Sequence, residues 1–170
     1  VDGVKVYFDQ GGVQVKGEFT WDGHYYDKDS GALVTNKFVE NYGRTYYLDE
    51  NGNKTIGSKE VNGAWYYFDQ YGEQVKGRFA SDDRYYDENG KQGTNRYFEL
   101  NGEWYYAGND GAILKGPQTI DGVKVYFDRG GVQVKGYFVK DSTDNNERYY
   151  DKDSGALATN QYIIAYNPYR

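Results

Sequence analysis

Short aromatic runs alternate with polar turns along the whole chain. Eight times, a tyrosine is followed two places later by Asp (by Gly108 in one unit), then by a turn glycine, and five residues further on by a second Gly or Asn. Side chains alternate between two faces of a strand, and Asp and Gly favour turns, so each repeat predicts two short strands around a tight turn. The repeated tyrosines are Tyr7, Tyr25, Tyr47, Tyr67, Tyr85, Tyr106, Tyr126 and Tyr149.

The turn residues predict a particular backbone. Asp can accept hydrogen bonds from its own turn, and the turn glycine tolerates positive φ. A position that accepts only Gly or Asn is expected in the left-handed region, which these two residues enter most cheaply. Pairs such as Asn62-Gly63 predict a second turn that joins successive hairpins. No window has sustained helical periodicity, so we expect almost no helix. The Gly-or-Asn positions are Gly17, Asn36, Gly57, Gly77, Asn95, Gly116, Gly136 and Asn160.

One hairpin of this size cannot bury enough surface to be stable. The units must therefore stack, which predicts an all-β fold, a β-solenoid of about eight hairpins. Units one, four and seven carry Gln-x-Lys-Gly, and units two, five and eight carry Thr-Asn. This period of three predicts about three hairpins per turn, or else it records duplication of a three-unit block. We expect one repeat domain over 1–170, with units at about 1–19, 20–39, 40–61, 62–79, 80–98, 99–120, 121–139 and 140–163.

Composition limits the function classes. With 21 Tyr, 8 Phe and 3 Trp but a mean hydropathy of −0.97, aromatic rings must carry most of the apolar burial. The net charge of −6 disfavours nucleic acid as a partner. The absence of cysteine excludes disulfides and thiol chemistry and suits a secreted, extracellular or cell-wall-associated bacterial protein. We expect no membrane partner, and we expect the chain to be a fragment of a longer protein.

The Gln-x-Lys pair is the strongest functional signal. If Phe8 pairs with Val13, then Tyr7 lies opposite Gln14 on the outer face, whereas Val4, Val6 and Phe8 join the valines inside. An outward ring beside an amide and an ammonium suits a sugar, because the ring covers its C–H face and the polar groups bind its hydroxyls. Covering about 40 Å² of apolar surface contributes roughly 1 kcal/mol, so each pocket is weak. Two or three pockets on one polymer raise avidity by roughly 10²–10⁴. The expected outward residues are Tyr7, Gln14 and Lys16; Trp65, Tyr67, Gln74 and Lys76; and Tyr126, Gln133 and Lys135.

Alternatives stay open for both components of the pocket, the aromatic ring and the Gln-x-Lys pair. The repeated tyrosine also occurs in units without Gln-x-Lys, which favours a structural role, and the pair itself could be a solvated strand face. The linker Asp141–Asn146 is about five residues longer than its counterparts, and it could occlude or reshape the third pocket. The stacking ring could also come from the next hairpin, as Tyr25 or Tyr26, Tyr85 or Tyr86, and Tyr149 or Tyr150.

The alternating Tyr-Phe-Asp…Gln-Val-Lys-Gly and Arg-Tyr-Tyr-Asp…Thr-Asn units resemble the glucan-binding repeat domain (domain V) of bacterial glucansucrases such as dextransucrase. The resemblance covers essentially the whole chain. It implies a β-solenoid whose pockets combine stacking aromatics with Gln14 and Lys16, Gln74 and Lys76, and Gln133 and Lys135. It also implies α-glucan as partner, together with the catalytic domains of the same parent glycosyltransferase.

Two related families are similar: the choline-binding repeats of bacterial surface proteins and the repeats of large toxins. A choline cage needs several aromatics around a quaternary ammonium. With three Trp and no Met, the chain departs from the choline-type composition.

Three rival functions stand beside sugar binding. Catalysis needs one asymmetric group of residues, whereas the recurrent Asp occurs in nearly every turn, so we expect no enzyme and no cofactor. The Asp27–Gly31 and Asp151–Gly155 segments offer closely spaced oxygens but lack a full calcium loop, so we expect no metal. A pure spacer or attachment module is the third alternative.

Overall fold

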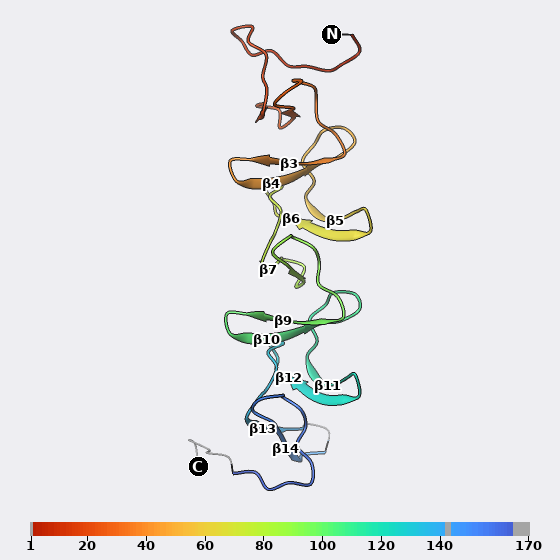
Figure 1. Ribbon diagram of the computed structural model, residues 1–170, viewed down its shortest axis with the longest axis vertical. Helices are drawn as coiled ribbons and strands as arrows, with labels where there is room; N and C mark the ends of the chain where they lie inside the picture. The colour runs from red at the N-terminus through yellow and green to blue at the C-terminus, as the bar shows by residue number, and fades with distance from the viewer. Residues whose placement is uncertain (1, 142–143, 165–170) are drawn as a thin grey trace. The chain divides into compact units, whose positions relative to one another are not determined.

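The computed structural model describes residues 2–141 and 144–164. This part of the chain contains fourteen strands in seven two-stranded sheets and no helix, which confirms the all-β prediction (Figure 1). The strands are β1 (Glu18–Phe19) with β2 (Tyr25–Tyr26), β3 (Lys37–Asn41) with β4 (Arg44–Leu48), β5 (Gly57–Val61) with β6 (Ala64–Phe68), β7 (Arg78–Phe79) with β8 (Tyr85–Tyr86), β9 (Arg96–Leu100) with β10 (Glu103–Ala107), β11 (Gly116–Ile120) with β12 (Val123–Phe127), and β13 (Tyr137–Lys140) with β14 (Glu147–Tyr150).

Three of the four longest hairpins turn at Asn-Gly or Asp-Gly pairs, which were predicted only to connect hairpins, and the fourth, β3–β4, turns at Tyr42-Gly43. Val61 pairs with Ala64 across Asn62-Gly63, and both turn residues have positive φ (51° and 80°). Two consecutive positive φ values characterise the type I′ turn, whose twist matches that of the flanking strands. The turn at these pairs was therefore predicted correctly, but its role was wrong, because it closes a hairpin of its own.

The eight predicted Asp…Gly turns are also present, and a single antiparallel bridge closes each of them. Only one bridge forms because the second strand is shared between two hairpins. The Val75 N–H donates to Tyr67 O of its own unit, whereas the Gln74 N–H donates to Thr45 O of the preceding hairpin. These shared segments link each hairpin to the one before it.

The backbone predictions for the turns are confirmed. Asp9 Oδ1 accepts hydrogen bonds from the N–H groups of Gly11 and Val13, both at 2.8 Å. All eight turn glycines have φ between 70° and 87°, and all eight Gly-or-Asn positions have φ between 47° and 80°. The lower values belong to the asparagines, which shows that a Cβ is tolerated at this second position but not preferred.

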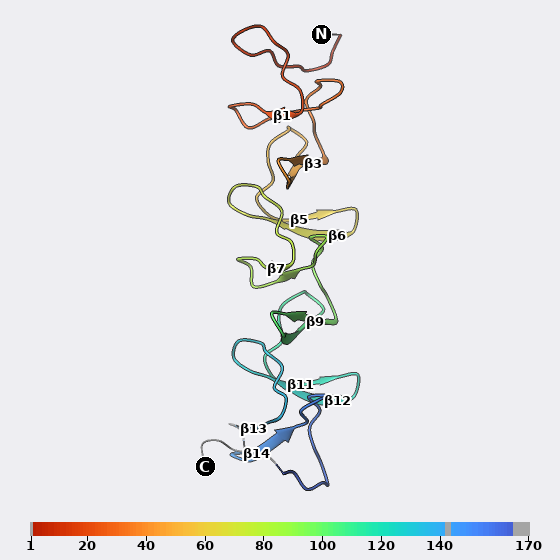
Figure 2. The ribbon, with the colours of Figure 1, turned by 60° about the vertical axis from the view of Figure 1, so that its left-hand side comes forward.

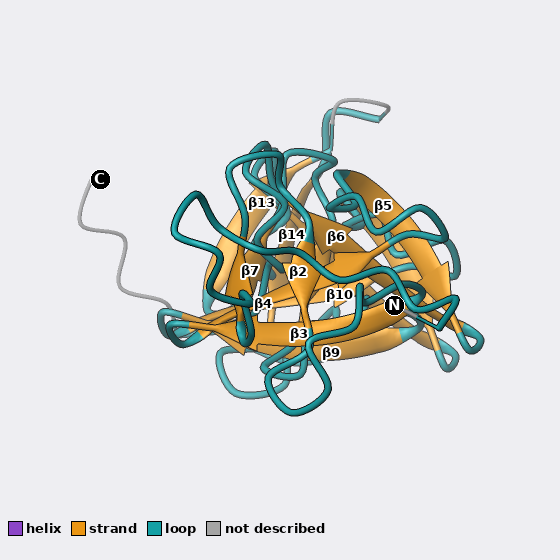
Figure 3. Cartoon of the chain, turned by 90° about the horizontal axis from the view of Figure 1, so that it is seen from above, coloured by secondary structure: helices purple, strands orange, loops and turns teal. Residues whose placement is uncertain are grey.

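The chain forms two compact units. One runs to Asp82 and includes Tyr86–Gln92; the other comprises Asp83–Tyr85 and the chain from Gly93 onward. Within each unit, successive hairpins point to different sides, as β3–β4 and β5–β6 do in the first (Figures 1 and 2). Seen from above, the described residues form strands and loops alone (Figure 3). Each unit is a β-solenoid of stacked hairpins. The number of hairpins per turn and the single-domain organisation remain predictions.

Aromatic rings fill the interior of both units, as the composition predicts. In the first unit Phe68 is fully buried, and its ring lies 6.3 Å from the rings of both Phe38 and Tyr47. In the second unit Phe127 is fully buried, and its ring lies 6.4 Å from that of Tyr97. In both cases the covering rings belong to the preceding hairpin.

The prediction that the first hairpin repeat (residues 1–19) buries its own hydrophobic face was wrong. Phe8 is 52% exposed and Val13 64% exposed, and Val4 is also exposed. Phe8 occupies the repeat position of Phe68 and Phe127, but no hairpin precedes it among the described residues. Burial at this position therefore comes from the neighbouring unit and not from the repeat itself.

Candidate functional site

The Gln-x-Lys strand has a register one residue away from the predicted one. Phe8 bridges Gln14, and likewise Phe68 bridges Gln74 and Phe127 bridges Gln133. A slip of one residue moves a side chain to the opposite face of a strand. The prediction that these glutamines point outward was therefore wrong: Gln74 is 7% exposed and Gln133 is 8% exposed.

Each buried glutamine supports the turn of the next repeat. Gln74 Nε2 donates to Asn89 O at 3.3 Å, and Gln133 Nε2 donates to Ser154 O at 3.4 Å. A Cβ added to Gly90 or Gly155, the following turn glycines, would lie 2.1 or 2.4 Å from the same Nε2 atoms. The glutamines thus have a structural function that the sequence did not reveal.

The lysines stay nearer the surface. Lys16 Nζ donates to Asp29 O at 2.9 Å, and Lys135 Nζ donates to Asp153 O at 3.2 Å. Lys76 Nζ donates instead to Thr45 Oγ1 at 2.9 Å. An ammonium carries three N–H donors, so one contact of this kind leaves donors for a ligand.

The tyrosines proposed as stacking rings lie at the border of the interior. Tyr7, Tyr67 and Tyr126 are half-buried, with ring centroids 5.7, 5.8 and 5.7 Å from those of Tyr26, Tyr86 and Tyr150. Each of these rings packs on one side against a tyrosine of the next hairpin and so helps to position the Gln-x-Lys strand, and its stacking on a sugar remains a prediction. The rings of the next hairpin are buried at Tyr25, Tyr26, Tyr85, Tyr86 and Tyr150 and half-buried at Tyr149, which packs 5.1 Å from Phe138.

One exposed ring at the third Gln-x-Lys pair is Trp104, which the sequence did not single out. Its side chain is 39% exposed, and its carbonyl accepts the Gln133 N–H at 2.7 Å. Lys135 Nζ lies 5.4 Å from the centroid of the Trp104 ring. The sequence does mark this position, because Trp104 stands two residues before the repeated tyrosine of its hairpin. The carbonyl at this position accepts a hydrogen bond from the shared strand, roughly thirty residues later in the chain.

Two hollows share Trp104, Gln133 and Lys135. One has a volume of about 420 Å³ and extends along Val123 and Ser154; the other, of about 400 Å³, extends along Tyr137. Exposed aromatic and aliphatic groups thus adjoin an amide, an ammonium and turn carbonyls. This combination is the one predicted from the repeats, but the ring comes from the preceding hairpin.

The second Gln-x-Lys pair lacks this ring. Thr45 takes the place of Trp104, because its carbonyl accepts the Gln74 N–H at 2.8 Å. Trp65, predicted beside Gln74, pairs instead with the following loop, where its carbonyl accepts the Gln92 N–H at 2.9 Å. That loop contains Thr94 in place of the lysine. Only the third pair therefore unites all three groups within the described chain.

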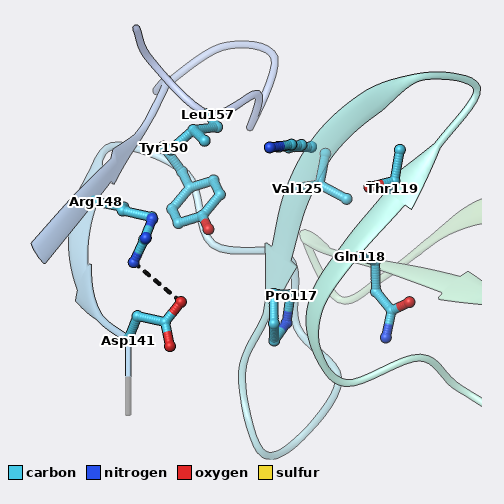
Figure 4. Close-up of a pocket in the computed structure, with 9 residues that line it drawn as sticks. Pro117, Gln118, Thr119, Val125, Asp141, Arg148, Tyr150 and Leu157 are labelled. Atoms are coloured by element: carbon cyan, nitrogen blue, oxygen red, sulfur yellow. Dashed lines mark hydrogen bonds and ion pairs between the residues drawn. The ribbon is translucent and has the colours of Figure 1, made fainter. Parts of the chain in front are cut away.

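A further hollow of about 320 Å³ lies between β11–β12 and β14, lined by Gln118, Thr119 and Tyr150 (Figure 4). Arg148 and Asp141 form an ion pair at 3.0 Å at its edge, and Arg148 also bonds Asp144, which holds the pKa of that carboxyl well below its usual value. This hollow does not include Trp104 or Gln133.

The long linker Asp141–Asn146 was predicted to reshape the third pocket. Its described residues do not line either Trp104 hollow, and residues 142–143 lie outside the described part of the chain.

The candidate calcium segments use their oxygens internally. Asp27 Oδ1 accepts hydrogen bonds from the N–H and the hydroxyl of Ser30, which lower the pKa of Asp27; Ser154 lowers the pKa of Asp151 in the same way. In the described ranges, no group of three or more His, Cys, Asp or Glu is placed to hold a metal ion. Nor does any helix there have the length and hydropathy to cross a membrane.

Stacked hairpins and shared strands define a module built from repeats, and comparison with known proteins identifies the repeat. The model of the choline-binding repeat matches residues 1–38, 55–97 and 114–162, so the chain belongs to the choline-binding repeat family. Because repeats of this kind cover most of the chain, it is a repeat module.

Two relatives are glucosyltransferases from Streptococcus mutans. Glucosyltransferase-S is 38% identical over 95% of this chain, and glucosyltransferase-I is 43% identical over 91%. The chain spans only 12% and 11% of their lengths, so it resembles a small part of each. The predicted resemblance to the repeat domain of glucansucrases, with choline-binding repeats as cousins, is thereby confirmed.

Solved structures agree on the fold. Choline-binding protein F from Streptococcus pneumoniae, crystallised in the presence of a peptidoglycan analogue, is 27% identical with a TM-score of 0.74, covering 95% of this chain and 58% of its own. The choline-binding domain of CbpL from the same species has a TM-score of 0.74 at 23% identity, covering 96% and 86%.

Proposed function

We propose that this chain is a non-catalytic carbohydrate-binding module that holds α-glucan of the dextran type. In this proposal it helps a parent glucosyltransferase retain its growing polymer outside the cell. The observation that carries the proposal is the convergence of Trp104, Gln133 and Lys135 on two adjoining hollows. Support also comes from the glucosyltransferase relatives, which align along nearly the whole chain.

The chemistry of the site suits a neutral sugar. The exposed face of Trp104 can cover the C–H face of a glucose ring, while Lys135 and the turn carbonyls near Ser154 can bind hydroxyls. Covering about 40 Å² of apolar surface contributes roughly 1 kcal/mol, so a single site has low affinity. Two hollows around one ring favour two consecutive sugar units over a single monosaccharide.

The other Gln-x-Lys pairs are proposed as weaker contacts for the same polymer. Gln14 with Lys16 and Gln74 with Lys76 offer the polar groups, but the aromatic position is Thr45 in the second site. A long glucan chain can use a strong and a weak site together, which raises avidity by roughly 10²–10⁴. Tyr7, Tyr67 and Tyr126 serve these sites by positioning the strand.

Trp104→Ala is expected to reduce binding to isomalto-oligosaccharides about tenfold, because it removes the stacking surface and part of both hollows. Affinity electrophoresis through dextran-containing gel measures the effect as lost retardation. Trp65→Ala is the matched control, since Trp65 occupies the same position of its repeat, is 47% exposed and lines neither hollow. Equal retardation of the parent and both variants would contradict the site.

Thr45→Trp is expected to strengthen glucan binding at the second pair. The substitution places an aromatic ring where the third site has Trp104, beside Lys76 and above Gln74. We expect stronger retardation in the dextran gel than for the parent chain. Thr119→Trp, at a position whose own side chain lines neither Trp104 hollow, is the control for added surface hydrophobicity. No gain over that control would show that the Thr45 position is not equivalent to Trp104.

The alternative is a cell-wall or choline-type attachment module, which the family match favours. It predicts retention on immobilised choline and none on dextran, whereas a pure spacer predicts retention on neither matrix. Running the chain on both matrices separates the three functions.

A further inference from the structure

Lys54 directs its ammonium against two aromatic rings. Its Nζ lies 4.1 Å from the centroid of the Phe19 ring and 4.5 Å from that of the Tyr46 ring. The two rings meet edge to face at 5.0 Å, and Phe19 also packs edge to face on Tyr25 at 5.1 Å. Cations within about 6 Å of a ring centroid are attracted by the ring's electron-rich face, so both rings hold this ammonium.

The rings are the main partners of the ammonium. No carboxylate among the described residues forms an ion pair with Lys54, and its side chain is half-buried. Burial accordingly lowers the pKa of Lys54, with no acidic neighbour to oppose the shift. A lysine usually keeps its ammonium in water, so this placement is unusual.

The fold fixes this placement. Lys54 stands at the repeat position of Gln14, Gln74 and Gln133, bridges Leu48, and places its Cβ under the next turn glycine, Gly72. In the sixth unit the same position is Ile113, which cannot supply a cation. The backbone thus follows the common repeat pattern, and only the side chain at this position supplies the charge.

We propose that Phe19 and Tyr46 form a site for a small quaternary ammonium ion, and that Lys54 of the same chain occupies it and excludes such ligands. Tyr46 is buried and Phe19 half-buried, so the site becomes open only where the Lys54 side chain is removed. A methylated ammonium suits such rings because it has no N–H donor and needs no hydrogen-bond acceptor. Lys54 is therefore a specificity-determining residue: it separates this chain from family members that bind choline. The family match covers 1–38 and 55–97 and omits the segment between them, which carries both Tyr46 and Lys54.

Lys54→Ala tests the proposal. Alanine keeps the Cβ beneath Gly72 and removes only the part of the side chain that fills the site. Choline is titrated into the full chain by calorimetry, and we expect binding at least about tenfold tighter than to the parent. The uncharged isostere 3,3-dimethyl-1-butanol should bind Lys54→Ala more weakly than choline does, because it cannot attract the rings electrostatically.

Two matched variants separate charge from volume. Lys54→Arg keeps a cation on the rings, and Lys54→Met fills the space without charge, so neither should gain choline binding. If Lys54→Ala retains the parent's far-UV CD spectrum but does not bind choline, the proposal is overturned. Equal binding of choline and its neutral isostere would overturn it as well.

A measurement on the parent chain does not depend on the folding of any variant. Ring currents from Phe19 and Tyr46 should shift the ε-methylene protons of Lys54 upfield of those of the other lysines, and added choline should leave them unchanged. Lys54 protons at the position of an exposed lysine, or a saturable shift with choline, would contradict occupation of the site. Both tests are independent of dextran binding, so they stand or fall separately from the proposed function.

Discussion

Phe68→Ala is expected to lower the free energy of unfolding of its unit by about 3–5 kcal/mol, the range measured for removing a fully buried ring. Phe68 has no exposed surface and packs against the rings of Phe38 and Tyr47 from the preceding hairpin. Because each hairpin of a solenoid is stabilised mainly by its neighbours, losing this ring weakens the contact between two repeats. Urea unfolding monitored by CD and tyrosine fluorescence measures the change.

Phe8→Ala is the matched control within the same compact unit. Phe8 occupies the same position of the repeat, but its side chain is 52% exposed. Its replacement should cost less than about 1 kcal/mol, because little surface returns to water and no cavity opens. Equal destabilisation by the two substitutions would contradict the conclusion that the neighbouring hairpin, and not the repeat itself, buries this ring.

Gly90→Ala is expected to destabilise the chain by about 1–3 kcal/mol more than Gly12→Ala does. Both glycines have φ near +76°, so the cost of placing alanine in this backbone is the same, about 1–2 kcal/mol. A Cβ at Gly12 meets nothing within 4 Å, whereas a Cβ at Gly90 would lie 2.1 Å from Gln74 Nε2. The buried amide must then move and lose its bond to Asn89 O.

A double-mutant cycle isolates that contact. In a Gln74→Ala background the added methyl group has space, so the extra cost of Gly90→Ala should disappear. Thermal unfolding of the four chains gives the coupling energy. Additive effects would show that the glutamine does not support the turn of the next repeat.

The sequence predicted the features of this chain that depend on local backbone chemistry. The eight turns and their left-handed Gly-or-Asn positions are determined by the residues that occupy them, and the structure confirms each one. The register of the Gln-x-Lys strand is different. A slip of one residue exchanges Gln14 and Val15 between two faces, and the pattern contains aromatic and valine residues on both, so hydrophobicity alone did not determine it.

The sequence predicted the residue types of the candidate site but not which aromatic residue belongs to it. Gln133 and Lys135 were singled out, and the structure places both at the shared hollows. Trp104 was missed because it joins them through a hydrogen bond between strands roughly thirty residues apart. The tyrosines seemed suitable because tyrosine has both a ring and a hydroxyl, but a chain with so few aliphatic residues needs those rings for its core.

The three tryptophans provide the most direct test of the proposed glucan site. In a ¹⁵N-labelled chain each indole N–H gives one resonance, so titration with isomalto-oligosaccharides reports on Trp21, Trp65 and Trp104 separately. We expect the Trp104 resonance to shift saturably and the Trp65 resonance to stay in place. A Trp104 resonance that remains unchanged while the oligosaccharide binds would contradict the assignment of the site to Trp104, Gln133 and Lys135.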